Sequence, residues 1–316
     1  MIKSLKHVKN FLSRDRRSEK EIILLASTIA KSNRTLSFID DFAEIEFSAF
    51  SQWGEDGIID WLVSKLPMIP KTFVEFGVEN YRQANTRLLI QMQNWRGLII
   101  DGSPENIRDI KRQDISWRQQ LHSLNEFITT ENIDKLIVDA GFKGEIGLLS
   151  IDIDGNDYWV WQAITSVNPA IVVCEYNAVF GDLHPVTVPY RGDFDRTKAH
   201  YSNLYFGASL PALFYLAQEK GYTFVGTCAA GVNAFFVRDD IAFEIKKCIC
   251  SLSAFPSKFR EARGVGGDLL FLDGVKRSEL ICDCPLINVA NGEPTTIREM
   301  GNIYGQQWMV GERRIF

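Results

Sequence analysis

The 316-residue sequence predicts an α/β protein with a doubly wound, mostly parallel sheet that ends in an antiparallel hairpin. Between residues 47 and 240, five short runs rich in Val, Ile, Leu and Phe alternate with segments of helical periodicity, which is typical of βαβ units. Each run ends in a polar or acidic residue, as strands buried on both faces often do. Two further strand-like runs follow a strong helix and complete seven strands.

The five parallel strands are expected at 72–77, 97–102, 124–129, 146–154 and 170–177. The helix before the first strand is GEDGIIDWLVSKL, and those between the strands are NTRLLIQMQNW, PENIRDIKRQ, ENIDKLIVDAG and DYWVWQAIT. SLPALFYLAQEKG follows the fifth strand as a helix that ends at Gly221. YTFVGTC and NAFFVRD, joined by the turn-prone AAGVN, predict the hairpin.

The two flanks differ from this central part. Residues 1–46 are expected to form a helical N-terminal extension, whose first twenty residues are amphipathic and basic. Such a helix could lie on a membrane surface or a partner, or simply pack on the domain with its cations in water. Residues 241–316 are less periodic, and we expect a C-terminal extension that packs against the core or a second subunit. The central domain is therefore 47–240.

Composition excludes several classes of protein. The net charge of −5 and the pI near 5.5 argue against a nucleic-acid binder, which needs clustered cations. No apolar run approaches the roughly 20 residues that span a bilayer, and no secretory signal is evident. We therefore expect a cytoplasmic protein with reduced cysteines. The pairs Cys248/Cys250 and Cys282/Cys284 are spaced unlike the ligands of structural zinc sites.

The ends of the first two strands carry candidate ligand-binding residues, because ligands of doubly wound sheets bind outside the carboxyl ends of the strands. The first strand ends in Glu75, Phe76 and Gly77, a carboxylate followed by a glycine where the backbone can pass close to a ligand. A dinucleotide fingerprint would have three glycines here, so NAD is disfavoured. The second strand ends in Asp101, which can accept hydrogen bonds from ribose hydroxyls. Asp101 could instead cap the next helix, a role for which Ser103 is better placed.

The fourth and fifth strands end in further acids. Asp152, Asp154 and Asp157 lie within six residues, and strand alternation puts the first two on one side, where a cation or hydrogen-bond donors must offset their repulsion. Glu175 and Asn177 follow the fifth strand. Asp154, Glu175 and Asn177 could together bind Mg²⁺ through oxygen ligands, or Glu175 could act as a general base.

His184, in the loop GDLHPVTVPYR, is a second candidate for the base because its pKa lies near neutral pH. A purely structural loop histidine is the alternative. The sequence leaves the choice among metal, Glu175 and His184 open.

Taken together, these motifs resemble the FkbM-like branch of the class I S-adenosylmethionine-dependent methyltransferases. The matching segments span residues 51–240 and stand in the family's order: SQWGEDGIIDWL, FVEFGVENYRQANTRLL, GLIIDGSPENI, NEFITTENID, LLSIDIDGNDYWVWQAI, VVCEYN and GASLPALFYLAQEKGYTFVGTCAAGVNAFFVRDD. The resemblance implies a Rossmann-like sheet of seven strands and S-adenosylmethionine as cofactor. Val78, Glu79 and Asn80 stand where methyltransferases commonly have a glycine-rich turn.

The resemblance also implies roles for individual residues. Glu75 and Gly77 would line the methionine side of the cofactor, Asp101 would hold the ribose with Ser103 beside it, and the Asn125 region would lie near the adenine. Gln52 and Asp56 would reach over the site. Asp152 and Asp154 would face the sulfonium.

Methyl transfer from a sulfonium is an in-line displacement, so the protein mainly aligns the acceptor and removes its proton. The acidic strand ends and the resemblance lead us to expect O-methylation of a sugar or glycoconjugate precursor. A small-molecule O-methyltransferase of secondary metabolism, an NAD-linked oxidoreductase and a non-catalytic binding module are the alternatives. The acceptor loops carry no transferable pattern.

Overall fold

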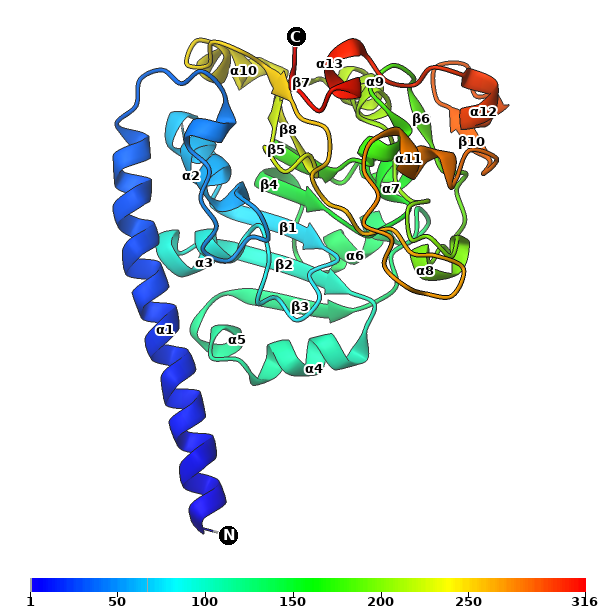
Figure 1. The fold of residues 1–316 in the computed structure, drawn as a ribbon. Helices are drawn as coiled ribbons and strands as arrows, with labels where there is room; N and C mark the ends of the chain where they lie inside the picture. The colour runs from blue at the N-terminus through cyan, green and yellow to red at the C-terminus, as the bar shows by residue number, and fades with distance from the viewer. Residues whose placement is uncertain (1, 67) are drawn as a thin grey trace.

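A seven-stranded sheet with strand order β3-β2-β1-β4-β5-β8-β7 forms the centre of the protein (Figure 1). The computed structural model describes residues 2–66 and 68–316, with side chains described from residue 18 onward. Strands β1 to β5 are parallel to one another, and β8 runs antiparallel to both β5 and β7. The predicted fold class is confirmed.

The strands occupy the expected apolar runs, with one shift. Their bounds are β1 Thr72–Phe76, β2 Arg96–Asp101, β3 Leu121–Asn125, β4 Gly144–Ile151, β5 Val167–Glu175, β7 Tyr222–Thr227 and β8 Asn233–Arg238. The order reverses at β1, which pairs with β2 on one side and β4 on the other: Glu75 lies opposite Ile99 and Ser150. The carboxyl ends of β1, β2, β4 and β5 therefore meet at one edge, at the switch point where such sheets bind ligands.

The prediction for β3 was wrong in position. The strand covers 121–125 instead of 124–129, because its register with β2 runs from Leu121 opposite Gly97 to Asn125 opposite Asp101. β3 is an edge strand with half-exposed side chains, so it has no apolar run to mark it. Residues 126–129 instead form a loop beyond the strand end.

Helices cover both faces of the sheet. They are α2 Glu55–Lys65, α3 Arg87–Gln93, α4 Pro104–Arg112, α5 Ile115–Arg118, α6 Ile133–Asp139, α7 Asp157–Ala163, α9 Leu210–Lys220 and α10 Asp239–Lys246. Successive strand residues alternate between two cores: Phe73 and Leu148 pack with α2, whereas Val74 and Leu149 pack with α6, α7 and α9. This alternation is the period-two pattern of a strand buried on both faces.

The N-terminal extension is one long helix, α1 (Ile2–Arg34), followed by the short 3₁₀ turn η1 (Phe42–Glu44). The N-terminal part of α1 projects beyond the body of the protein (Figure 1). Ala26 and Ala30 are buried, and Arg34 pairs with the buried Asp60 of α2. Most of the basic stretch for which membrane contact is predicted lies outside the described side chains. Among the described residues, we find no helix with the length and apolarity to cross a bilayer.

Small elements of the C-terminal extension pack on the long segment between β5 and α9. β6 (Val186–Thr187) forms a sheet with β10 (Leu286–Asn288) and β11 (Pro294–Thr295), while β9 (Ser253–Ala254) pairs with β12 (Arg314–Ile315). The remaining elements are η2 Ala178–Phe180, α8 Arg196–Ala199, α11 Val275–Glu279, α12 Ile297–Met300 and α13 Gln306–Met309. The extension thereby reaches the carboxyl edge of the sheet.

Candidate active site

Two adjoining cavities at the carboxyl edge of the sheet are lined by the strand ends, beside a more open hollow of about 390 Å³ around Asp195 and Arg196. The larger cavity, about 320 Å³, is lined at the strand ends by Glu75, Asp152 and Glu175. The smaller cavity, about 200 Å³, is lined by Asp101 at the end of β2 and by the loop that follows β3. Both share four lining residues, Gly77, Glu79, Asp152 and Asp154. An elongated ligand can therefore extend from one cavity into the other.

Gly77 separates the two cavities and must be glycine. Its φ is +67°, and a Cβ added to it would lie 1.6 Å from the carbonyl oxygen of Asp152. Its N–H donates to the carbonyl of Ile100 at 3.1 Å, which ties the end of β1 to β2. The backbone at the end of β1 thus passes directly against the end of β4.

Glu75 is buried and holds the segment that follows β1. Its Oε1 accepts from the N–H of Asn85 at 2.8 Å and from the Ser150 hydroxyl at 3.4 Å, and its Oε2 accepts from the N–H and hydroxyl of Thr86. Burial, opposed by these hydrogen bonds, raises the pKa of Glu75 to about 7. Glu75 therefore lines the larger cavity and also fixes the shape of its wall.

Asp101 lines the smaller cavity with its carboxylate already oriented. Its Oδ1 accepts from the N–H of Ser103 at 2.8 Å and from the side-chain amide of Asn106 at 3.0 Å. The Ser103 hydroxyl caps α4, accepting from the N–H of Asn106, and Ser103 does not line either cavity. The cap is thus Ser103, as its position in the sequence indicated.

Asn125 is placed differently from the prediction. Its side-chain amide donates to the carbonyl of Asp101 at 3.0 Å and joins β3 to β2 instead of lining a cavity. The residues just after it, Glu126, Phe127 and Ile128, line the smaller cavity. That this region lies near an adenine stays a prediction, for which Phe127 and Ile128 offer the apolar surface.

Of the two residues expected to reach over the site, Gln52 and Asp56, only the first lines a cavity. Gln52 lines the larger cavity. Asp56 is buried at the start of α2, where its Oδ2 accepts from the N–H groups of Ala49, Phe50 and Ser51 at 2.6 to 2.8 Å. Burial raises its pKa to about 6. Asp56 therefore does not reach over the site and instead holds the loop that carries Gln52.

Asp152, Asp154 and Glu175 come together at the ends of β4 and β5. Each offers a carboxylate oxygen, and these oxygens lie within 4.8 Å of one another. Burial, and then the charge of the neighbouring acids, raises the pKa of both Asp152 and Glu175 well above the usual range. Glu175 Oε2 is buried without a hydrogen-bond partner. Asp152 and Glu175 are thus two close, buried carboxyl groups, each of which disfavours ionisation of the other.

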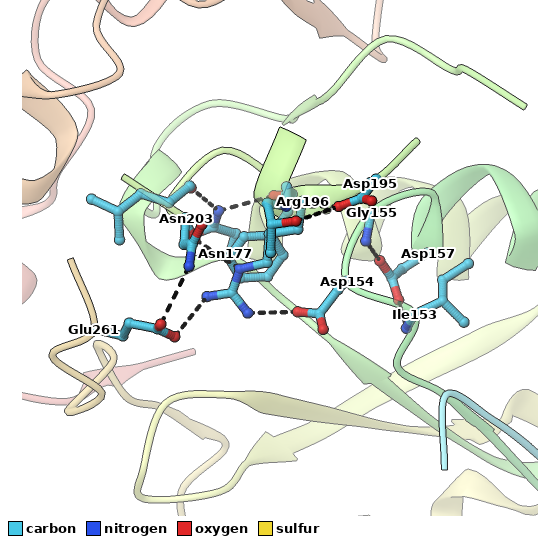
Figure 2. A network of polar contacts seen from close by, with 12 residues as sticks. Ile153, Asp154, Gly155, Asp157, Asn177, Asp195, Arg196, Asn203 and Glu261 are labelled. Carbon is cyan, nitrogen blue, oxygen red and sulfur yellow. Dashed lines mark hydrogen bonds and ion pairs between the residues drawn. The ribbon is translucent and has the colours of Figure 1, made fainter. Parts of the chain in front are cut away.

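Arg196 of α8 compensates part of this negative charge (Figure 2). Its guanidinium lies 2.6 Å from Asp154 Oδ1 and 3.6 Å from Glu261 Oε2, and it covers the ring of Phe206 with 4.0 Å between the guanidinium carbon and the ring centroid. Asp154 itself is about half exposed and has a φ of +54°. Sequence reasoning missed Arg196 because α8 is a helix of only four residues, too short for an apolar periodicity to mark it.

Asp157, the third acid of this segment, has a structural role. Its two oxygens accept from the N–H groups of Ile153 at 2.8 Å and Gly155 at 2.9 Å (Figure 2). Burial raises its pKa to about 6. Asp157 thus closes the turn between β4 and α7 that presents Asp154.

Asn177 and His184 do not take the predicted places. The Asn177 side chain lines the larger cavity, but its amide donates to the carbonyls of Leu204 and Phe206 and its Oδ1 accepts from the N–H of Val179. The acids that could hold a cation, among the described residues, are Asp152, Asp154 and Glu175, whereas the Asn177 side chain is engaged by backbone groups. His184 Nε2 lies 2.9 Å from the carbonyl oxygen of Asn302, and His184 lines neither cavity.

The C-terminal extension supplies one wall of the larger cavity. Ser257, Phe259, Glu261 and Arg277 line it. Phe259 meets Trp53 edge to face, with 6.1 Å between ring centroids. The sequence offered no signal for this wall, because residues 241–316 carry no periodic pattern.

Comparison with known proteins returns solved structures alone. No protein-family model matches the sequence, and no curated protein matches it. An S-adenosylmethionine-dependent methyltransferase from Clostridium acetobutylicum is similar at 10% identity and a TM-score of 0.37, over 58% of this chain and 90% of that one. The CurJ carbon methyltransferase is similar at 12% identity and a TM-score of 0.38, over 73% of this chain and 69% of that one.

An O-methyltransferase family protein from Burkholderia thailandensis is similar at 12% identity and a TM-score of 0.33, over 58% of this chain and 59% of that one. Likenesses this slight carry no argument about the chain's activity. The function is therefore argued from the site.

Proposed function

We propose that this protein is an S-adenosylmethionine-dependent methyltransferase that methylates a hydroxyl of a sugar or glycoconjugate precursor. The observation that carries the proposal is the arrangement of Asp101, Gly77 and the acidic strand ends along two connected cavities. The order of these residues, from a ribose-type carboxylate to a reaction centre, matches the order of groups in a nucleoside linked to an amino acid.

The charges along the cavities suit this cofactor better than a dinucleotide. Glu79, Asp152 and Asp154 line the junction of the two cavities. A pyrophosphate at this point would meet three acidic side chains, of which Asp154 alone is paired with a described cation, Arg196. A sulfonium and an ammonium group are cations and would be attracted. Acidic residues at the junction therefore favour S-adenosylmethionine over NAD.

Each part of the cofactor has residues to hold it. Asp101 would accept hydrogen bonds from the ribose hydroxyls, with Phe127 and Ile128 against the adenine. Glu75 and Gly77 would line the methionine side. When bound, the cofactor supplies an electrophilic methyl group, and the protein's task is to align an acceptor with it and take a proton.

The Asp152–Glu175 pair is the best-placed proton acceptor. Burial and the neighbouring acids raise the pKa of both groups, which makes an ionised carboxylate of the pair a stronger acceptor for the proton of a hydroxyl. His184 is outside the cavity and is left out of this role. Arg196 keeps Asp154 paired, so Asp152 and Glu175 remain to act on the acceptor.

The wall of the larger cavity supports a polyhydroxylated acceptor. Gln52, Asn85 and Asn233 line it with amide groups, and Trp53 and Phe259 line it with aromatic rings. Amide groups can pair with sugar hydroxyls, and the ring faces suit the apolar face of a sugar.

Mg²⁺ is the alternative to a protein base. Asp152, Asp154 and Glu175 have the oxygen ligands that it prefers. However, the Arg196 guanidinium already pairs with Asp154, so we derive no step through a metal. Methyl transfer that persists at full rate in EDTA would rule out a role for the metal. Transfer that is lost in EDTA and restored by Mg²⁺ would instead show that the metal takes the place of the protein base.

Calorimetry tests the proposal directly. Wild-type protein should bind S-adenosylmethionine and S-adenosylhomocysteine and should not bind NADH. Asp101→Ala should weaken both by about tenfold or more, because a charged hydrogen-bonding partner of the ribose is lost. Asp109→Ala, an exposed acid of α4, is the matched control and should bind as wild type. Failure of wild type to bind either methionine-derived ligand would overturn the proposal and favour a non-catalytic module.

A further inference from the structure

Arg277 of α11 is a buried cation in the wall of the larger cavity. Its side chain is nearly inaccessible, with the residue 4% exposed. Nη1 donates to the carbonyl of Phe259 at 2.6 Å and Nη2 to the carbonyl of Ser257 at 3.2 Å, while Nε is buried without a partner. A guanidinium carries five N–H donors, so two backbone carbonyls leave it under-bonded.

Arg277 also lacks an acidic partner among the described residues. The other cation of this cavity, Arg196, pairs with both Asp154 and Glu261. Asp273 is the acid whose charge acts on Arg277, but its carboxylate lies 3.5 Å from the guanidinium of Arg260. Buried charges in proteins are nearly always paired, because removing an ion from water is costly.

Negative and positive charges therefore line different parts of the larger cavity wall: acids at the strand ends and Arg277 in the C-terminal extension. Acids gather at the ends of β4 and β5, where Arg196 offsets part of their charge. Arg277 stands in the wall formed by the C-terminal extension, beside Ser257 and Phe259. Burial lowers the pKa of the Arg277 guanidinium, so an anion placed against it would relieve an unfavourable state.

We propose that Arg277 binds an anionic group of the acceptor, a carboxylate or a phosphate, and so selects acidic sugars over neutral ones. That a hydroxyl of such an acceptor is methylated depends on the function proposed above, whereas the binding of its anionic group depends on Arg277 alone. Guanidinium groups bind both kinds of anion through paired N–H donors. The C-terminal extension thereby sets acceptor choice.

The experiment compares three sugars by calorimetry on the full chain, with and without S-adenosylhomocysteine: glucuronate, glucose 6-phosphate and neutral glucose. At least one anionic sugar should bind about tenfold or more tightly than glucose, since a charged hydrogen bond is worth more than a neutral one. The preferred anion distinguishes the carboxylate from the phosphate. Equal affinity for all three sugars, or no binding of any, would overturn the proposal.

Variants assign the preference to Arg277. Arg277→Gln should reduce the preference by about tenfold, while Arg260→Gln, a neighbouring exposed arginine outside the cavity wall, should keep it. If circular dichroism shows that Arg277→Gln is unfolded, Arg277→Lys retains the charge and should retain part of the preference. A preference that survives in folded Arg277→Gln would overturn the assignment.

The outcomes separate this inference from the proposed function. An anion preference without binding of S-adenosylhomocysteine would support the anion site at Arg277 and overturn the proposal that the protein is a methyltransferase. Binding of S-adenosylhomocysteine without an anion preference would remove the Arg277 site alone.

Discussion

The backbone of Gly77 approaches Asp152 so closely that an added Cβ would fall 1.6 Å from the Asp152 carbonyl oxygen. Gly77→Ala should therefore lower the free energy of unfolding by about 2 kcal/mol or more, through strain at positive φ and the forced separation of β1 from β4. Urea unfolding measures the change. Gly144→Ala is the matched control: its φ of +68° is equal in strain, but nothing lies within 4 Å of the added Cβ. It should cost about 1 kcal/mol. Equal losses in both variants would contradict the role given to this close approach.

Glu175→Gln should make the protein more stable at pH 8. The folded-state pKa of Glu175 is raised, so its ionisation at high pH destabilises the fold, and the amide removes that loss. The melting temperature should rise by a few degrees at pH 8 and little at pH 5. Glu261→Gln removes an acid already paired with Arg196 and should give no gain. Methyl transfer should be lost in Glu175→Gln, as expected of a site that trades stability for function.

Stability should fall as pH rises from about 5 to 7. Burial raises the pKa of Asp56 and Asp157 to about 6 and of Glu75 to about 7, so the folded state holds protons that the unfolded chain has already released. The stabilisation from each group is therefore complete at a pH below its pKa in the unfolded chain. It is lost as the pH rises to its pKa in the folded protein, at roughly 1 kcal/mol per pH unit for each group. Urea midpoints across this range measure the slope. Glu75→Gln should flatten it near pH 7, and the exposed Glu105→Gln should not.

Arg34→Ala should detach the end of α1 from α2. Arg34 Nε donates to Asp60 at 2.9 Å, and Asp60 is almost fully buried with one further partner, Gln93. Because Arg34 is about one-third exposed, we expect a loss of about 1–2 kcal/mol, less than for a fully buried pair. Thermal unfolding measures it, with the exposed Lys31→Ala as the control. An unchanged melting temperature would show that the pair contributes nothing to stability.

The central strands could be predicted because burial on both faces leaves an apolar run in the sequence. β1, β2, β4 and β5 satisfy this condition, whereas β3, an edge strand with half-exposed side chains, does not, and its position was missed.

The sequence predicted candidate site residues at the strand ends, and the structure brings some of them to the cavities and turns others away. Sequence marks polar residues at strand ends, yet it does not distinguish a carboxylate that faces a cavity from one that turns back to backbone N–H groups. Asp101 and Asp152 line the cavities, while Asp56 and Asp157 hold loops. The difference lies in local dihedral angles and in distant contacts. Arg196 and Arg277 were missed because α8 and α11 are helices of four and five residues, too short for an apolar periodicity to mark them in the sequence.

The edge-to-face contact of Trp53 with Phe259 joins residues about two hundred positions apart. Contacts this distant in sequence form after local ones during folding, because the intervening chain must first be ordered. The sheet can therefore assemble before the wall that completes the larger cavity. The larger cavity is complete only where the C-terminal extension packs against the segment that carries Trp53, so acceptor binding reports on that packing and not on the sheet alone.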